Sequence, residues 1–378
     1  MPATPDGLLA PRYDAHGLAG VLPAVLASLT GQAADLAPAR RAVVVLVDGL
    51  GDDLLRQRRG HAPFLRALLP TARRLMAGFP TTTATSMGSF GTGLPPGSHG
   101  LVGYQVLVPE RDTILNELSF DVDVNPRLWQ PHETVFERAT AAGITVTRVG
   151  PGYFDGSGLT SAALRGGAFM AAQSLQRRVD ATVTALRASP RALVYLYWGD
   201  LDKVGHVYGC RSPEWGAELE SIDAALAQLA TRVPADTALY VTGDHGMVDV
   251  PLERRLDLAH DAELAAGIRH VGGEPRSPQL YCQPGAGADV LATWASRLGA
   301  DALVMGRDEA VARGWFGAVE PRVLPRIGDI VVAMVQDVAV VDSRTARPEV
   351  LALLGLHGSL TSVEMAVPLL SVQARSPG

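Results

Sequence analysis

The sequence has few cysteines, no cluster of basic residues and no long apolar run, and each shortage excludes a class of protein. Its two cysteines, Cys210 and Cys282, are too few and too far apart for a disulfide framework or a thiolate zinc site. No apolar stretch reaches the roughly 20 residues that a membrane-spanning helix needs. The short apolar run at 18–29 follows no basic segment of the kind that opens a signal peptide. We therefore expect a cytoplasmic protein without a membrane segment.

The charge balance is mildly acidic, with 33 lysines and arginines against 39 aspartates and glutamates. A surface that binds nucleic acid without regard to sequence needs clustered positive charge, so we expect no dedicated nucleic-acid surface. Small anionic substrates stay compatible with this total if bound metal ions set the local field. With 378 residues, 47% of them hydrophobic, the chain can bury a full core in one large domain or two unequal ones. The sequence does not indicate the oligomeric state.

Apolar, β-branched runs alternate with helical segments along most of the chain. Such runs are typical of strands covered on both faces of a parallel sheet. The expected strands are 42–47, 144–149, 192–197 and 238–241. The expected helices are 63–76, 134–143 with a Thr134/Glu137 capping box, 174–189, and one that starts at Pro213 after the N-cap Ser212. This order predicts an α/β fold with a doubly wound, mostly parallel sheet.

The predicted domain organisation has three parts. Residues 1–40 form a leader with one amphipathic helix, 41–261 and 326–378 form the core, and 262–325 form a small inserted α/β cap. Two hairpins are also expected, one over 102–120 with its turn at 109–112, and one over 327–341. An insertion of this kind can overhang a site, so Arg276 and Trp315 are candidates for contacting a leaving group, with a stabilising role as the alternative.

Three expected strands end in aspartate, at Asp48, Asp202 and Asp244. Because parallel strands present their carboxyl ends at one edge of the sheet, we expect the three carboxylates to converge there. Two of them have histidine partners, at His206 four residues after Asp202 and at His245 next to Asp244. Another histidine, His357, comes late in the chain. Carboxylates and imidazoles without thiolates predict a zinc site, with manganese as the alternative.

A hydroxyl-rich stretch at 78–87 runs on through a glycine- and proline-rich segment to Gly100. Its proline and its threonines, followed by a helix-forming run, favour one threonine at a helix N-terminus facing an anion. A threonine-rich turn without chemistry is the alternative. The histidines at His99 and His132 are expected to be structural.

The ordered motifs resemble those of the alkaline phosphatase superfamily, and within it the type I phosphodiesterase/nucleotide pyrophosphatase family. The resemblance spans Asp48 to His357. It rests on Val47-Asp48-Gly49, on Pro80-Thr81-Thr82-Thr83 with the following Thr92-Gly93-Leu94-Pro95, on Asp202 with Gly205-His206, on Asp244-His245-Gly246-Met247, and on His357-Gly358.

This resemblance implies a dizinc hydrolase with Thr83 as the nucleophile. Asp202, His206 and His357 would hold one metal ion, and Asp48, Asp244, His245 and Thr83 the other. The implied substrate is a small anionic phosphoester, with nucleotides among the candidates. A threonine hydroxyl is a poor nucleophile that a bound metal can activate, and two metals can clamp an in-line displacement at phosphorus. We therefore expect a covalent phosphothreonine intermediate.

The chain departs from the family pattern where the phosphodiesterases add an asparagine that donates to a phosphoryl oxygen. Tyr104 stands at that place, while Asn116 follows in the expected hairpin and is our candidate for the role. The departure leaves open a phosphomonoesterase or phosphonate hydrolase of the same superfamily. A non-catalytic metal- or phosphate-binding protein is the further alternative, although no glycine-lysine-serine/threonine P-loop sequence supports it. Sulfatases fit poorly, since the nucleophile loop lacks their cysteine or serine motif.

Overall fold

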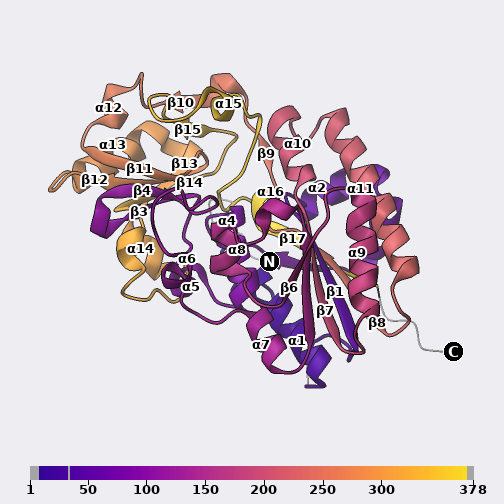
Figure 1. Cartoon of the computed structure of the whole chain (residues 1–378). Helices are drawn as coiled ribbons and strands as arrows, with labels where there is room; N and C mark the ends of the chain where they lie inside the picture. The colour runs from indigo at the N-terminus through magenta and orange to yellow at the C-terminus, as the bar shows by residue number, and fades with distance from the viewer. Residues whose placement is uncertain (1–7, 33–34, 373–378) are drawn as a thin grey trace.

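The computed structural model describes residues 8–32 and 35–372. Two larger sheets organise the chain (Figure 1). Residues 1–7 and 33–34 of the predicted leader lie outside the described residues, as do residues 373–378 of the predicted core. Within the described ranges no helix is long and apolar enough to cross a membrane.

The main sheet has seven strands, five of them parallel. In sheet order they are β2 (Arg73–Met76), β17 (Ala366–Val372), β8 (Thr237–Thr242), β1 (Arg41–Val47), β7 (Ala192–Trp198), β5 (Thr145–Gly150) and β6 (Ala168–Ala171). The run β8-β1-β7-β5-β6 is parallel, while β17 is antiparallel to both of its neighbours. The predicted doubly wound, mostly parallel sheet is confirmed.

Strand β1 shows why the central strands are apolar throughout. Its Val44 and Leu46 side chains join one hydrophobic cluster, and Val43 and Val45 join another on the opposite face of the sheet. Successive side chains of a strand point to opposite faces, so a strand covered on both sides needs apolar residues at every position.

Helices cover both faces of this sheet. One face packs against α1 (Val21–Thr30), α4 (Thr83–Thr92), α7 (Val135–Ala141) and α8 (Gly158–Ala163). The other face packs against α2 (Asp52–Gln57), α3 (Pro63–Leu68), α9 (Leu175–Arg187), α10 (Asp200–Tyr208) and α11 (Pro213–Arg232). The predicted capping box at Thr134 and Glu137 opens α7, and Ser212 caps α11.

The helix predicted over 63–76 is wrong in its second half. Helix α3 ends at Leu68, a short 3₁₀ turn holds Pro70, and residues 73–76 form strand β2 at the edge of the main sheet. Proline lacks the N–H that would continue the helix. The pairing of β2 with β17, almost 300 residues later, then makes the following segment a strand.

A second sheet of six strands lies beside the main one (Figure 1). Its order is β13 (Ala302–Gly306), β14 (Ile330–Met334), β12 (Ser277–Cys282), β11 (Ile268–Glu274), β3 (Gln105–Val108) and β4 (Thr113–Asn116). The predicted hairpin over 102–120 is confirmed as β3 and β4, turned at 109–112. The sheet therefore uses strands before and after 262–325, and the division of the chain into domains stays a prediction.

The hairpin predicted over 327–341 is wrong. Strand β14 pairs with β12 on one side and β13 on the other, so both of its edges are occupied. Strand β15 (Ala339–Val341) instead pairs with β10 (Arg255–Asp257).

Shorter elements complete the described chain. A two-stranded pair joins β9 (Val248–Asp249) to β16 (Gly355–Leu356). The remaining helices are α5 (Pro96–His99), α6 (Pro126–Trp129), α12 (Ala262–Ala265), α13 (Gly287–Leu298), α14 (Arg307–Ala312), α15 (Pro348–Leu351) and α16 (Ser362–Met365). Helices α12 and α13 pack on the second sheet through a hydrophobic cluster of their own.

Candidate active site

The carboxyl ends of the parallel strands bring the predicted ligand residues together in two groups. Asp48 follows β1, Asp244 and His245 follow β8, and these three form one group whose ligand atoms lie within 4.8 Å of one another. All three residues are buried. The convergence follows from the parallel order β8-β1-β7, which places these strand ends at one edge.

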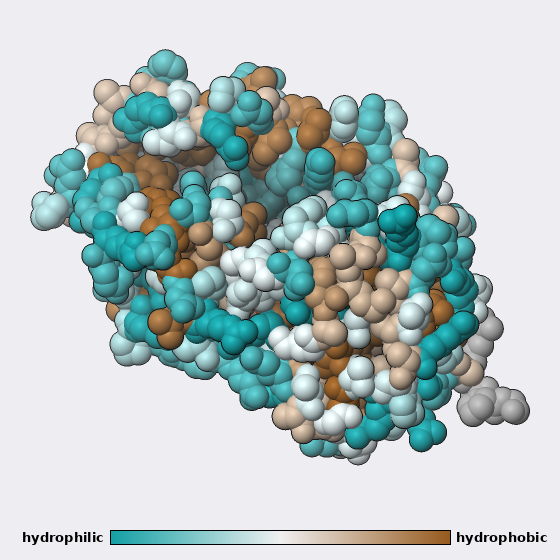
Figure 2. Space-filling view, viewed as in Figure 1, coloured by the Kyte–Doolittle hydropathy of each residue, from teal (hydrophilic) through white to brown (hydrophobic). Residues whose placement is uncertain are grey.

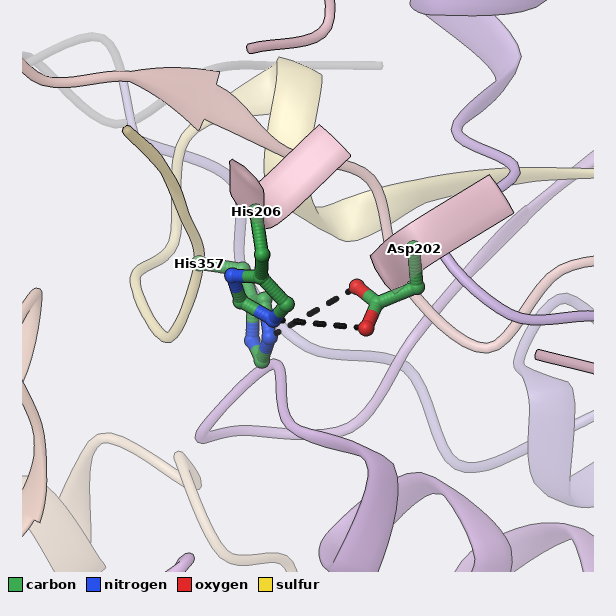
Figure 3. A group of neighbouring side chains, drawn as sticks. All are labelled: Asp202, His206 and His357. Carbon is green, nitrogen blue, oxygen red and sulfur yellow. Dashed lines mark ion pairs between the residues drawn. The ribbon is translucent and has the colours of Figure 1, made fainter. Parts of the chain in front are cut away.

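The second group combines a helix with a late loop. Asp202 and His206 lie one turn apart on α10, which begins just after β7, and His357 follows β16. Figure 3 shows the carboxylate of Asp202 facing the imidazoles of both histidines. The Asp202 Oδ2–His206 Nε2 distance is 3.3 Å, and the Asp202 Oδ1–His357 Nε2 distance is 4.0 Å.

The two groups are in contact through their histidines. The rings of His245 and His357 stack with their centroids 3.8 Å apart. A glycine makes the close approach of the strand ends possible: Gly49 has a φ of 74°, and a Cβ there would lie 3.0 Å from the Asp202 Cα. A side chain at this position would therefore push the two groups apart.

Each of the three imidazoles is oriented by a backbone carbonyl. The Nδ1 atoms of His206, His245 and His357 lie 2.7, 3.0 and 2.7 Å from the carbonyl oxygens of Gly355, Gly246 and Thr81. A carbonyl only accepts hydrogen bonds, so Nδ1 carries the proton and Nε2 is the atom left to act as a ligand. This is the usual outer-shell arrangement of metal-binding histidines.

The carboxylates of both groups have buried oxygens without partners in the described chain. Asp48 Oδ1, Asp202 Oδ1 and Asp244 Oδ2 are buried and have no hydrogen-bond partner among the described residues. Buried acceptors are normally satisfied, and unpaired carboxylate oxygens facing imidazole Nε2 atoms are what a cation would coordinate. The residues present therefore fit two divalent metal ions.

Electrostatics differ between the groups in the metal-free protein. Burial and the charges of Asp244 and Asp202 raise the pKa of Asp48 well above its usual range. Burial also raises the pKa of Asp244. Burial opposes ionisation of Asp202 as well, but His206 more than compensates and holds the Asp202 pKa below its usual range.

The pKa values of the two histidines of the second group are shifted in opposite directions. Burial lowers the pKa of His206, but the ion pair with Asp202 outweighs it and raises that pKa to about 9. Burial and the neighbouring imidazoles of His245 and His206 lower the pKa of His357 well below its usual value.

Thr83 stands at the first turn of α4, beside the first group. Its Oγ1 lies 3.3 Å from His245 Nε2, and Thr82 is the N-cap residue. The first peptide N–H groups of a helix have no intrahelical partner and favour an anion there. The expectation of a threonine at a helix N-terminus is thus met at Thr83.

The neighbouring threonines have different contacts, which separates Thr83 from them. The Thr81 hydroxyl donates to the Ser359 carbonyl and accepts from the Gly358 N–H, tying this loop to the segment after His357. The Thr82 side chain hydrogen-bonds to Glu274.

Sequence reasoning missed Glu274, which ends β11 and reaches the site from the second sheet. Burial raises its pKa to about 8, and its Oε1 has no hydrogen-bond partner among the described residues. The backbone of Gly358 leaves room for it, since a Cβ there would lie 2.7 Å from the Glu274 Cβ. No local pattern around Gly273-Glu274 could have indicated this contact. Tyr197 was missed too; its hydroxyl donates to Asp48 Oδ2.

Asn116 is not brought into either group. Its Oδ1 accepts from the N–H groups of Leu118 and Ser119, at 2.9 and 3.2 Å, and its side chain hydrogen-bonds to Tyr104. Asn116 and Tyr104 line a cavity of about 470 Å³ together with Glu274, on the side of the second sheet. Its role as a phosphoryl donor stays a prediction.

The other candidates of the sequence have structural surroundings. Arg276 is buried and forms two 2.8 Å hydrogen bonds to the Glu364 carboxylate, and Trp315 packs edge-on against Phe79. Neither lines the cavity at Thr83. His99 is buried and bonded to Ser89, in keeping with the structural role expected for it.

A second cavity, of about 440 Å³, opens directly beside the nucleophile candidate. Asp48, Thr83 and Asp202 are among the residues that line it. The rest of its wall is mainly apolar and includes Tyr153, Phe154, Leu159, Phe169, Tyr195 and Tyr197. We call it the aromatic cavity. A cavity of this size can hold the organic substituent of a small phosphoester.

The visible face of the molecule is hollowed between its upper-left and right-hand parts (Figure 2). The upper-left part holds the second sheet, and the right-hand part holds helices α9, α10 and α11 of the main sheet (Figure 1).

Comparison with known proteins agrees with this fold and this site. The family model of type I phosphodiesterases/nucleotide pyrophosphatases matches residues 42–360, which include all the candidate metal ligands and Thr83. Murine ectonucleotide pyrophosphatase/phosphodiesterase 5 is similar in structure, with a TM-score of 0.72 and 19% identity, over 88% of each chain.

Two further solved structures share the fold. An inactive threonine-to-alanine variant of the murine protein, in complex with AMP, matches with a TM-score of 0.71 and 18% identity over 89% of this chain and 88% of that chain. Phosphonoacetate hydrolase from Sinorhizobium meliloti 1021, in complex with phosphonoformate, matches with a TM-score of 0.69 and 22% identity over 90% and 92%. The chain therefore belongs to the type I phosphodiesterase/nucleotide pyrophosphatase family of the alkaline phosphatase superfamily and is a metal-dependent hydrolase of phosphoester bonds.

Proposed function

We propose that this protein hydrolyses phosphodiester or pyrophosphate bonds of small molecules through a covalent phosphothreonine at Thr83. The observation that carries the proposal is the pair of ligand groups beside this hydroxyl, with three partnerless carboxylate oxygens and three oriented imidazoles. Asp202, His206 and His357 would hold one divalent ion, and Asp48, Asp244 and His245, with Thr83, the other. Such ions lower the pKa of the threonine hydroxyl and stabilise the leaving oxygen.

Zinc is the metal we propose, because the donor set combines carboxylates with imidazoles and has no thiolate. Manganese is the alternative. A cytoplasmic location is also a proposal, which rests on the two free cysteines Cys210 and Cys282.

The residues around Thr83 account for both halves of the reaction. The Thr83 oxygen forms a bond to phosphorus while the bond from phosphorus to the leaving oxygen breaks. The free N–H groups at the start of α4 face the charge that develops on the phosphoryl oxygens. Water then attacks phosphorus and cleaves the bond to Thr83, which restores the hydroxyl. Two displacements give net retention at phosphorus, and inversion with a chiral substrate would indicate one direct displacement.

The substrate we propose is a small phosphoester with an aromatic or apolar substituent, nucleotides included. The aromatic cavity next to Thr83 supplies the space and the surface for such a group. The AMP complex of the murine neighbour supports a nucleotide, and the inactivity of its threonine-to-alanine variant supports a threonine nucleophile.

A phosphomonoesterase or phosphonate hydrolase is the second candidate. It is favoured by the similarity to phosphonoacetate hydrolase and by the position of Asn116, whose side chain bonds to Tyr104 and to the backbone of Leu118 and Ser119. The metal ligands and Thr83 would be the same in either enzyme.

The test compares turnover of bis-para-nitrophenyl phosphate and para-nitrophenyl phosphate by zinc-loaded protein. We expect a preference for the diester and a loss of about 10³-fold or more in Thr83→Ala. The exposed Thr71 gives a matched control, Thr71→Ala, which should keep full activity. Mass spectrometry of acid-quenched protein should find the phosphoryl group on the peptide with Thr83.

Two results would change the assignment. Turnover that persists in Thr83→Ala would overturn the covalent intermediate. A preference for the monoester that still depends on Thr83 would move the protein to the phosphatase branch.

A further inference from the structure

Arg148 is a buried arginine in the wall of the aromatic cavity. It lies on β5, and its exposed fraction is only 8%. Its guanidinium makes no hydrogen bond or ion pair with any residue that the structure describes, and its Nε is fully buried without a partner. The guanidinium carbon lies 5.5 Å from the centroid of the Phe169 ring, which is a cation–π contact.

The guanidinium of each other buried arginine of the described chain makes at least one hydrogen bond or ion pair. Arg276 pairs with Glu364, Arg165 pairs with Glu137, and Arg178 and Arg326 donate to backbone carbonyls. A buried charge without a partner is costly, and a cation–π contact offsets only part of that cost. Arg148 is therefore the exception that needs an explanation.

The groups around Arg148 do not supply the missing partner. Asp155 and Tyr195 act on it electrostatically, but neither forms an ion pair or hydrogen bond with it. The nearby wall is apolar, with Phe154, Leu159 and Phe169. Burial lowers the Arg148 pKa, as expected for a cation held in such surroundings.

The wall of the aromatic cavity is thus apolar except for a few polar groups. Thr83, Asp48 and Asp202 border the cavity where the phosphoryl group would react, and Arg148 adds unpaired donors to the same wall. A guanidinium binds a carboxylate or a phosphate through two parallel hydrogen bonds, and such a pair gains strength in apolar surroundings.

We propose that Arg148 is a specificity-determining residue that selects substrates whose phosphoryl substituent is an apolar or aromatic group bearing an anionic carboxylate or phosphate. This inference rests on the proposed function, because it assumes that the substituent enters the aromatic cavity while phosphorus reacts at Thr83. The anion would satisfy the guanidinium, and the aromatic wall would hold the connecting ring.

The test uses mixed diesters of para-nitrophenol, whose release is followed by absorbance. The second substituent is para-carboxyphenyl, para-phosphonophenyl or the neutral para-carbamoylphenyl, which has the shape of the carboxylate without its charge. For the wild type we expect kcat/KM to be about tenfold or more higher with an anionic ester than with the carbamoyl ester. The ratio of kcat/KM between the carboxyphenyl and phosphonophenyl esters identifies the anion that fits the site.

The variants separate charge recognition from general damage. Arg148→Met should lose the preference for the anions and keep turnover of the carbamoyl ester within about threefold, and Arg148→Lys should keep part of the preference. Arg66 is exposed and lies outside the lining of the aromatic cavity, so Arg66→Met is the control for the loss of one positive charge and should leave the preference intact.

A binding measurement makes the inference independent of turnover. Calorimetry should find para-carboxybenzylphosphonate binding the wild type at least about tenfold more tightly than para-carbamoylbenzylphosphonate, and Arg148→Met binding both alike. If the wild type bound the carboxyl and carbamoyl phosphonates equally and turned over the charged and neutral esters equally, the proposed role of Arg148 would be overturned. If no diester is hydrolysed at all, the proposed function fails, while a charge preference in binding would still support the anion site.

Discussion

The two ligand groups lie in contact through the rings of His245 and His357, yet they balance their charge in different ways. The more enclosed group consists of Asp48, Asp244 and His245, and burial together with the charges of Asp244 and Asp202 raises the pKa of Asp48. In the group around Asp202 the carboxylate is paired with a protonated His206 when no metal is bound. The enclosed group thus depends on a cation for its charge balance, whereas the other group has an internal substitute for one.

The largest effect should come from removing one carboxylate from each group in the metal-free protein. At pH 7 we expect Asp48→Asn to stabilise the metal-free fold, because the raised pKa of Asp48 opposes folding at neutral pH. Asp202→Asn should destabilise the metal-free fold by about 3–5 kcal/mol, because it leaves His206 without its partner. Urea unfolding after chelation measures both.

The pH dependence checks the sign of the first effect. A carboxyl group whose pKa is raised in the fold contributes stability below its unfolded pKa, near 4, and loses it as the pH rises through the folded value. The gain from Asp48→Asn should therefore be absent at pH 4 and grow toward pH 7. With zinc bound Asp48→Asn should destabilise the protein instead, because it removes a ligand. If Asp48→Asn and Asp202→Asn destabilised the metal-free protein equally, the two groups would not differ in how they balance their charge.

A second prediction sharpens the comparison within the group of Asp202, His206 and His357. The pKa of His206 is raised to about 9, so its ion pair contributes stability that is complete below pH 6.5 and lost as the pH rises through 9. We expect metal-free His206→Gln to be less stable than the wild type by up to about 3 kcal/mol at pH 6, with the difference disappearing by about pH 10.

His357 provides the contrast for this measurement. Its pKa is lowered, so its contribution is present above pH 6.5 and lost as the pH falls. The stability difference between the wild type and His357→Gln should therefore shift with pH in the opposite direction. Parallel pH profiles for the two variants would show that the ion pair with Asp202 is not what distinguishes them.

The smallest expected effect lies outside both groups, at Asn116. Because its amide bonds to Leu118, Ser119 and Tyr104, we expect Asn116→Ala to lower diester turnover less than tenfold. A phosphoryl donor would instead cost about 10²-fold or more in kcat. The measurement is kcat for bis-para-nitrophenyl phosphate, with Asn125→Ala, at the N-cap of α6, as a control for the loss of a capping amide.

Much of the main sheet could be read from local patterns. Runs such as 42–47 are apolar at every position because β1 is covered on both faces, and a parallel sheet collects the ends of β1, β7 and β8 at one edge. The failures came where pairing is nonlocal. Strand β2 depends on β17, and β14 is held between β12 and β13, so nothing near them in sequence indicated their partners.

The sequence by itself determined the fold class and the candidate ligand residues, because strand ends and residue types are local properties. The division of these ligands into two groups and the choice of Thr83, the first residue of α4, followed from the resemblance of the ordered motifs to a known family. Only the tertiary structure brought Glu274 to Thr82, placed Asn116 in the cavity on the second-sheet side, and left Arg148 without a partner in the aromatic cavity. Those features depend on how the second sheet and the strand β5 meet the site. Contacts between distant segments follow from packing and the exclusion of water, which no short stretch of sequence encodes.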